Sequence, residues 1–244
     1  YVAWKSTDGD YSETKAATWQ TMLDGMMPKA RLLDLIRNFV CFNDSNDKVV
    51  KILAAYHQYF GVRKAIERAE EAVAGDGKIG VFWHTQGSGK SLSMVFFAHL
   101  LQRHLDSPTI VVITDRNDLD DQLFGQFGRC SAFLRQNPVQ ATSREDLKNL
   151  LEGREANGII FTTMQKFTDG DEPLCDRSNV VVMVDEAHRG QYGLTEKMDA
   201  SGKVSVGAAR VVRKALPNAS YIGFTGTPIA LEDRNTREIF GDYI

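Results

Sequence analysis

The stretch from Lys78 to Met94 constrains this chain more than any other. It opens with an apolar, β-branched and aromatic run at 79–83, which is typical of a buried strand. The sequence Thr-Gln-Gly-Ser-Gly-Lys-Ser follows at 85–91, and an apolar run resembling a helix begins at Leu92. A strand, a glycine-rich turn, Lys-Ser and a helix in this order predict a loop that binds phosphate groups.

The residue types in this loop suit a polyphosphate. Two glycines let the backbone curl so that successive N–H groups point inward, and the positive end of the following helix favours the same anion. We expect Lys90 to reach the β- and γ-phosphates and Ser91 to offer its hydroxyl to Mg²⁺. The predicted phosphate-loop residues are Thr85, Gln86, Gly87, Ser88, Gly89, Lys90 and Ser91.

The loop departs from the strict G-x-x-x-x-G-K-[ST] pattern at one position, since His84 stands where the first glycine is expected. The alternative is a glycine-rich turn that ends in Lys-Ser by chance. A second apolar run, at 180–184, argues against chance because Asp185-Glu186-Ala187-His188 follows it. We expect Asp185 to hold Mg²⁺ and Glu186 to orient or deprotonate the attacking water. The alternative here, a solvated acidic turn, is disfavoured downstream of a phosphate loop.

The composition is that of a soluble globular protein, with 43% hydrophobic and 25% charged residues among 244. The net charge of −3 neither supports nor excludes contact with nucleic acid. Cys41, Cys130 and Cys175 show no metal-ligand spacing, which predicts buried free thiols in a reducing, cytoplasmic compartment. No apolar run approaches the roughly 20 residues of a membrane span, so we expect no membrane partner.

Ahead of the phosphate loop, the chain has a helical pattern. Residues 18–42 carry apolar side chains at near-helical spacing, broken by Pro28, which predicts two helices. Residues 43–48 form a short polar linker, and 49–73 is a long helical pattern that contains Gln58. The Gln58 amide can donate and accept at the edge of adenine, with an aromatic neighbour stacked on the base. A helix core of aromatics with an exposed glutamine fits the spacing equally well.

After the loop, strands alternate with helices. Strands are predicted at 109–114, 158–163 and 220–224, helices at 143–151 and 207–216, and a mobile loop at 189–207. This alternation predicts an α/β fold, with a mostly parallel sheet covered by helices on both faces. Polar clusters follow each strand, and the carboxyl ends of parallel strands share one edge, so we expect a nucleotide site there.

The ordered motifs resemble a known family. The phosphate loop, Thr-Asp-Arg-Asn-Asp-Leu-Asp at 114–120, Thr-Thr-Met-Gln-Lys-Phe at 162–167, Asp-Glu-Ala-His at 185–188 and Phe-Thr-Gly-Thr-Pro at 224–228 resemble motifs I, Ia, Ib, II and III of superfamily 2 helicases and translocases. Tyr-His-Gln-Tyr-Phe at 56–60, Asp-Glu-Ala-His-Arg-Gly-Gln-Tyr-Gly at 185–193 and Phe-Gly-Asp-Tyr-Ile at 240–244 are similar to the restriction (motor) subunit of type I restriction-modification enzymes. This resemblance runs from about residue 30 to the end.

The resemblance implies a RecA-like P-loop NTPase domain that uses ATP and Mg²⁺ to pump double-stranded DNA. It implies modification and specificity subunits as partners, and a nuclease that cuts DNA far from the recognition site. It gives each motif a role: catalysis by Lys90, Asp185, Glu186 and His188, adenine contact by Gln58, coupling by Thr225, Gly226 and Thr227, and DNA-backbone contact by Asp115, Arg116, Thr162 and Thr163.

The resemblance also predicts how the chain divides. Residues 1–45 are expected to be a helical lead-in and 46–244 the first RecA-like motor domain. The nuclease motif of the family is expected before Tyr1, and a second motor domain with an arginine that completes the ATP site after Ile244. We therefore expect this chain to bind ATP but to hydrolyse it weakly, because half of the positive groups that stabilise the transition-state charge are missing, the arginine of the second motor domain among them.

Two rival interpretations stay open. Another superfamily 2 motor, such as a type III restriction subunit, a chromatin remodeller or a plain helicase, would have the same phosphate loop and acidic box. Residues 191–193 and 56–60 discriminate among these motors. The second rival is a non-motor nucleotide-binding module with a vestigial site. It is disfavoured because Lys90, Ser91, Asp185 and Glu186 are all chemically intact.

Overall fold

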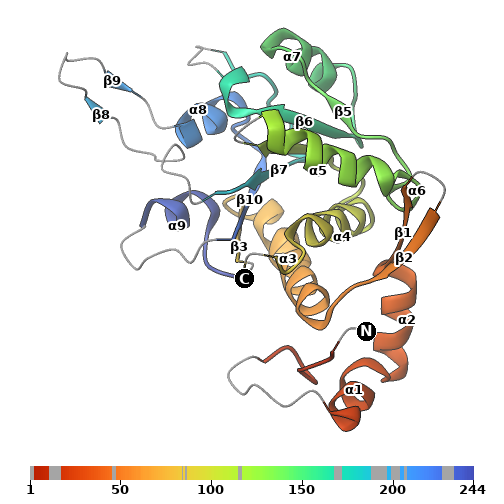
Figure 1. Ribbon diagram of the computed structural model, residues 1–244. Helices are drawn as coiled ribbons and strands as arrows, with labels where there is room; N and C mark the ends of the chain where they lie inside the picture. Colours follow the sequence, from red (N-terminus) through yellow and green to blue (C-terminus); the bar gives the residue numbers. More distant parts are fainter. Residues whose placement is uncertain are drawn as a thin grey trace.

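A six-stranded sheet in which all neighbouring strands are parallel forms the centre of the computed structural model (Figure 1). The strand order is β3-β10-β7-β4-β6-β5. The structure describes residues 3–10, 18–45, 48–83, 85, 87–114, 117–167, 172–187, 197–198, 204–205, 208–226 and 234–244. The sheet strands are β3 (Lys78–Trp83), β4 (Thr109–Thr114), β5 (Val139–Gln140), β6 (Ile159–Thr163), β7 (Val180–Asp185) and β10 (Ser220–Thr225).

Helices cover both faces of this sheet, because successive strand residues point to opposite sides. Ile110 and Val112 of β4 join a core that includes α3 (Tyr56–Ala74), α4 (Lys90–His104) and α5 (Asn117–Arg129). Val111 and Ile113 face the other core, with α7 (Arg144–Glu152), α8 (Ala208–Ala215) and α9 (Arg234–Phe240). The predicted α/β fold class is confirmed.

The five predicted strands and the helices predicted at 143–151 and 207–216 are all present, with small shifts of their ends. The two-residue strand β5 was missed, because two residues are too few to show a period. Short elements link the rest: α6 (Ser131–Leu134), the 3₁₀ turn η1 (Met164–Lys166), and the antiparallel pair β8 (Lys197–Met198) and β9 (Val204–Ser205). That pair lies in the predicted mobile loop, most of which falls outside the described residues.

The helix predicted over 49–73 is partly wrong. Its first residues form β2 (Lys48–Leu53), which pairs antiparallel with β1 (Val40–Ser45), and α3 begins only at Tyr56. The run Val-Val-Lys-Ile is β-branched and favours a strand once a partner strand is available. The hairpin also takes in most of the predicted linker at 43–48. Its strands lie on either side of the expected domain boundary at residue 45, which stays a prediction.

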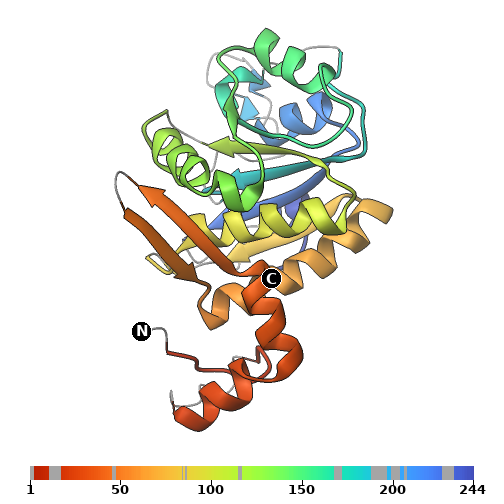
Figure 2. The same cartoon turned by 90° about the vertical axis from the view of Figure 1, so that its right-hand side faces the viewer.

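The two predicted N-terminal helices are present as α1 (Trp19–Met26) and α2 (Lys29–Asn38). Thr18 caps α1, since its hydroxyl accepts a hydrogen bond from the Thr21 N–H at 3.0 Å. Pro28 separates the two helices. Both lie outside the sheet-and-helix layers, at one corner of the molecule (Figure 2).

The free edge of β3 is covered by the last residues of the chain. The Val81 N–H donates to the Asp242 carbonyl at 2.9 Å, and the Ile244 N–H donates to the Val81 carbonyl at 3.0 Å. Gly80, at φ +145°, permits this approach, because a Cβ there would lie 2.7 Å from the Asp242 oxygen. The segment at 240–244 therefore protects an edge that would otherwise be open to other strands.

All three cysteines are free thiols, as predicted. Cys41 and Cys130 are buried as expected, whereas Cys175 is only half-buried. Within the described part of the chain, no helix combines the length and apolarity that crossing a bilayer requires.

One core histidine makes stability depend on pH. His99 of α4 is buried, stacks on the Phe133 ring at 4.0 Å and pairs through Nδ1 with the Phe133 carbonyl at 3.0 Å. Burial lowers the pKa of His99 to about 4, with nearby Arg103 acting in the same direction. The unfolded chain takes up a proton between pH 6.5 and 4 while the folded chain does not, so stability falls as the pH falls through this window.

We predict that acidification from pH 7 to pH 5 removes about 2 kcal/mol of unfolding free energy through His99 alone. Urea denaturation of the wild-type protein and a His99→Leu variant at both pH values isolates this contribution, because all other titrating groups are shared. The variant should lose about 2 kcal/mol less than the wild type. An equal loss in both proteins would contradict the assignment.

Candidate functional site

The predicted phosphate loop joins β3 to α4 in a conformation that glycines make possible. Gly87 and Gly89 have φ of +82° and +88°, a region that disfavours side chains. Gly89 stands at the N-cap of α4, and the first N–H to donate within the helix is that of Leu92, to the Gly89 carbonyl at 3.0 Å, so the N–H groups of Lys90 and Ser91 precede the helical hydrogen bonds. A Cβ at Gly87 would meet no atom within 4 Å, so the loop is open on that side. An open, N–H-rich loop at a helix N-terminus fits an anion.

Lys90 lies between the two carboxylates predicted to act with it. Its Nζ lies 2.8 Å from Asp185 Oδ1 and also pairs with Glu186 Oε1. The side chains are only 18%, 12% and 22% exposed, respectively. Residues 95 positions apart in sequence thus form one charged cluster, at the edge of the sheet where the sequence analysis expects a nucleotide site.

The order and register of the strands bring these residues together. β10 lies between β3 and β7 and pairs Thr225 with Trp83 on one side and Phe224 with Asp185 on the other. All three strands run in the same direction, so their carboxyl ends meet at one edge. The predicted nucleotide edge of the sheet is therefore where Lys90, Asp185 and Thr225 lie.

The acidic turn has a strained backbone held by hydrogen bonds. Glu186 has φ of +51°, which is uncommon for a residue with a side chain. Its N–H donates to Asp185 Oδ1 at 2.9 Å, and the Ala187 N–H donates to the Phe224 carbonyl at 3.0 Å. Gly223 leaves room for this turn, since a Cβ there would lie 2.8 Å from the Ala187 Cβ. The turn aims Glu186 at Lys90.

Burial raises the pKa of the Asp185 carboxyl above its usual value. Lys90 opposes this effect, and the charge of Glu186 adds to it. Two carboxylates and one ammonium leave an excess of one negative charge in a site that excludes most water. A site of this kind favours a bound divalent cation.

The first turn of α3 is fastened to the phosphate loop. Gln58 Nε2 donates to the Gly89 carbonyl at 3.1 Å, while its Oε1 accepts from the Ala55 N–H at 2.8 Å. His57 Nε2 lies 3.0 Å from the Ser88 carbonyl. Gln58 is 4% exposed, so the interpretation as an exposed helix glutamine is wrong. Its contact with adenine stays a prediction.

A cavity of about 580 Å³ opens beside the phosphate loop. Its size suits a small organic ligand. Thr85 and Ser88 of the loop lie at its wall, with aromatic side chains from α3 and β3. The aromatic residues are Tyr56, Phe60, Phe82 and Trp83. A flat apolar ligand joined to a phosphate chain would fit this combination.

The cavity includes residues to which the sequence analysis gave no role in the site. Trp83 is 49% exposed at the end of β3, although it was assigned to a buried strand. Lys5, Gly9 and Ile244 also line the cavity. They come from opposite ends of the chain, so spacing along the sequence carries no signal for them.

Several predicted site residues lie outside the described part of the structure: Gln86, Asp115, Arg116, His188 and Thr227. Thr162 and Thr163, predicted to lie beside DNA, end β6 and are buried. Thr162 Oγ1 is buried without a hydrogen-bond partner among the described residues. Thr225 ends β10 and is buried, and Gly226 follows it.

Comparison with known families gives a match over most of the chain. Residues 57–244 match the SWI2/SNF2 ATPase family. The chain belongs to the SWI2/SNF2 ATPase family. The matched residues include the phosphate loop, the acidic turn and the C-terminal segment, which are the parts that form the site described above.

Individual relatives point to one branch of SWI2/SNF2-type ATPases. The type I restriction enzyme HindI endonuclease subunit of Haemophilus influenzae is 51% identical over 235 residues, which are 92% of this chain and 22% of that protein. The type I restriction enzyme SauCOLORF180P endonuclease subunit of Staphylococcus aureus is 29% identical over 246 residues, 95% of this chain and 24% of that protein. The chain thus spans about a quarter or less of the length of these relatives. The resemblance to type I restriction subunits is confirmed.

The fold of this SWI2/SNF2 ATPase has a counterpart among solved structures. The UvsW helicase from bacteriophage T4 superimposes with a TM-score of 0.52 at 14% identity, covering 89% of this chain and 67% of that chain. Similarity at this identity supports the fold, and it agrees with the predicted RecA-like domain.

The Lys90 cluster predicts a specific change in stability. Lys90→Met removes the ammonium group that pairs with Asp185 and Glu186, so two neighbouring carboxylates stay largely buried without a counter-charge. This should lower the unfolding free energy by about 2 kcal/mol at pH 8. At pH 5.5 the loss should be smaller. Lys90 lowers the pKa of the Asp185 carboxyl against the effect of burial, so removing Lys90 raises this pKa further. The destabilisation should therefore shrink as the pH falls, because a proton on Asp185 removes the uncompensated charge.

Urea denaturation at the two pH values measures this difference. A matched control is Lys148→Met, which removes only the exposed pair of Lys148 with Glu152 at 3.6 Å and should change stability by less than about 0.5 kcal/mol. If Lys90→Met matched the control at pH 8, the ion-pair cluster would not contribute to folding.

Proposed function

We propose that this chain is the ATP-binding motor domain of the restriction subunit of a type I restriction-modification enzyme. In this function, ATP hydrolysis drives translocation of double-stranded DNA before endonucleolytic cleavage of foreign DNA. One observation carries the proposal: Lys90 lies with Asp185 and Glu186 at the carboxyl edge of the sheet, beside an open phosphate loop. The 51% identity to the HindI endonuclease subunit over nearly the whole chain supports the choice of enzyme class.

The site offers a place for each part of ATP. The N–H groups of the loop and the first turn of α4 would hold the phosphates, and Lys90 would pair with their charge after leaving its carboxylates. The base would enter the aromatic cavity beside Thr85 and Ser88. Gln58, in the first turn of α3, would contact adenine. Its amide already donates a hydrogen bond to the Gly89 carbonyl of the phosphate loop.

The residues present also fit Mg²⁺. The ion prefers a few carboxylate and hydroxyl oxygens together with phosphates and water. Ser91 in the first turn of α4 and the buried Asp185 carboxylate would hold it, and the net negative charge of the cluster favours a cation. When bound, Mg²⁺ would neutralise the charge that develops on the transferred phosphoryl group.

Glu186 would orient or deprotonate the attacking water, since the turn at Glu186 keeps its carboxylate beside Lys90. His188 would act with it to couple hydrolysis to movement. Thr225, Gly226 and Thr227 would link the ATP site to DNA, and Asp115, Arg116, Thr162 and Thr163 would lie along the DNA backbone.

The wider assembly follows from the same proposal. The partners are double-stranded DNA, the modification and specificity subunits, and nuclease and second motor domains of a longer chain, in the cytoplasm. Residues 1–45 would be the lead-in from the nuclease and 46–244 the first motor domain. The relatives, in which this chain matches only 22–24% of the length, leave ample room for the other domains.

The first test is a titration of the protein with fluorescent ATP and Mg²⁺, beside Lys90→Ala and Glu186→Gln. Loss of a charge-assisted contact between Lys90 and a phosphate should weaken binding by roughly ten- to a hundred-fold. Glu186→Gln should bind ATP about as well as the wild type, because Glu186 is proposed to act on the attacking water during hydrolysis and not in binding. Equal affinities for wild type and Lys90→Ala would contradict the proposed phosphate site.

Measuring ATP hydrolysis distinguishes a DNA motor from a nucleotide-binding module that is not a motor. The chain alone should hydrolyse ATP weakly, because an arginine from a second domain completes the charge clamp in this proposal. A longer parent chain should show hydrolysis that double-stranded DNA stimulates and Lys90→Ala abolishes, measured by phosphate release. Hydrolysis that DNA leaves unchanged would favour a nucleotide-binding module.

A further inference from the structure

The segment at residues 3–10, here called the N-terminal strap, packs against α3, the helix whose aromatic side chains line the proposed base pocket. Trp4 is 2% exposed and belongs to the larger core. Its ring lies 6.3 Å from Tyr56 and 6.0 Å from Phe60, both of which line the cavity beside the phosphate loop. The strap is therefore anchored next to the pocket by a buried aromatic cluster.

The strap also forms part of the cavity wall. Lys5 and Gly9 line the same cavity as Tyr56, Phe60 and Trp83. Gly9 has φ of +93°, and a Cβ at this position would lie only 2.9 Å from the Phe60 ring. The strap thus runs close to Phe60 because a glycine is present there.

Arg31 of α2 fixes the strap in place. Its guanidinium donates hydrogen bonds to the carbonyls of Thr7 in the strap and Gly25 in α1. The same guanidinium lies over the Phe60 ring, 5.0 Å from its centre, a favourable distance for a cation above an aromatic face. One side chain therefore connects the strap, the lead-in helices and the pocket.

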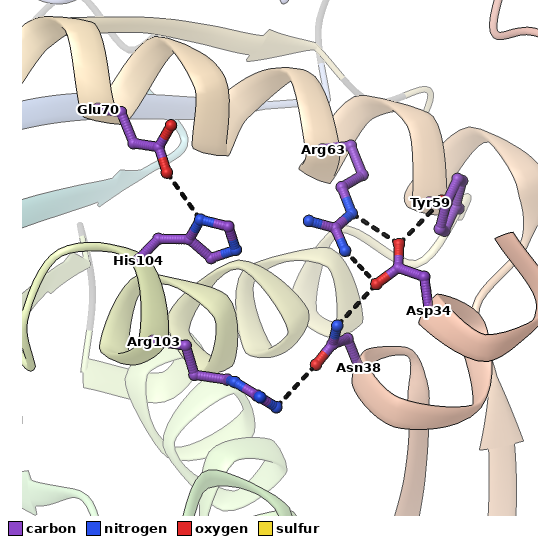
Figure 3. A network of polar contacts seen from close by, with 7 residues as sticks. All are labelled: Asp34, Asn38, Tyr59, Arg63, Glu70, Arg103 and His104. Atoms are coloured by element: carbon purple, nitrogen blue, oxygen red, sulfur yellow. Dashed lines mark hydrogen bonds and ion pairs between the residues drawn. The ribbon is translucent and has the colours of Figure 1, made fainter. Parts of the chain in front are cut away.

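A second set of contacts holds α2 against α3 and α4 (Figure 3). Asp34 Oδ2 accepts hydrogen bonds from Tyr59 Oη and Arg63 Nε, each at 2.8 Å. Asn38 donates to Asp34 and accepts from Arg103 of α4 at 3.0 Å. The lead-in is thus tied to the two helices whose N-termini form the nucleotide site.

We propose that the N-terminal strap is a wall of the nucleotide's base pocket, that Lys5 recognises the nucleoside end of ATP, and that Trp4 and Arg31 are positioning residues for this wall. The inference rests on the proposed ATP site and extends it. The phosphate loop binds any polyphosphate, whereas the strap contributes only when a base and ribose are attached. The part of the chain ahead of the motor domain thereby sets its affinity for nucleotide.

The test compares two ligands, Mg²⁺–ATP and Mg²⁺–inorganic triphosphate, by isothermal titration calorimetry. Lys5→Glu and Gly9→Ala should each weaken ATP binding by about five-fold, the effect of one lost surface contact. Triphosphate affinity should stay within about two-fold, because the triphosphate does not reach the strap. Lys5→Arg keeps the charge and should restore the ATP affinity.

Matched controls are available on the same chain. Lys51→Glu makes the same charge change on the exposed β2 strand, away from the cavity. Gly128→Ala adds a Cβ that meets no atom within 4 Å on α5. Both should bind the two ligands like the wild type. Cooperative thermal unfolding of Gly9→Ala checks its fold, and Lys5→Glu, at an exposed position, tests the inference independently.

The outcomes are distinguishable. ATP affinity unchanged in Lys5→Glu and Gly9→Ala, while Lys90→Ala weakens both ligands, would overturn the strap inference and leave the ATP site standing. Equal weakening of ATP and triphosphate would also overturn it, since the strap would then act on the phosphates. Failure of the wild type to bind either ligand, or no effect of Lys90→Ala, would overturn the proposed function itself.

Discussion

The position of Lys90 between Asp185 and Glu186 is the interaction on which the rest of the site depends. A buried ammonium is stable only with a counter-charge, and here two strand-end carboxylates supply it. A polyphosphate offers a competing counter-charge at the N-terminus of the same helix. In the proposed function, binding would exchange one set of ion pairs for another and would free Asp185 and Glu186 for metal and water.

The order of the strands in the sheet brings the residues of this cluster together. β10 lies between β3 and β7, so the loop that leads to Lys90 and the acidic turn follow two strands that are separated by one neighbour. Gly223 and Gly89 allow the close approaches that the turn and the loop need, against Ala187 and Gln58 respectively.

The sequence predicted those parts of the site that lie in continuous motifs. Lys90, Asp185 and Thr225 each follow an apolar strand, and parallel strands must end at one edge, so their meeting was foreseeable. The strand β2 was mistaken for helix because the residues of its partner β1 were assigned to a helix and a linker, so the run at 49–52 had no recognised strand to pair with. Lys5, Gly9 and Ile244 were missed because only the folded chain brings its two ends to the cavity. The role of the Gln58 amide at the Gly89 carbonyl likewise depends on tertiary contact.

The central claim is that Lys90 moves from its carboxylates to a nucleotide. A crystal structure of the chain with Mg²⁺ and a non-hydrolysable ATP analogue tests it most directly. The account predicts the triphosphate on the phosphate loop, Lys90 Nζ at hydrogen-bond distance from its β- and γ-phosphate oxygens, and the base against Tyr56 and Phe60. A triphosphate bound elsewhere, or Lys90 still paired with both Asp185 and Glu186 beside the bound analogue, would contradict it.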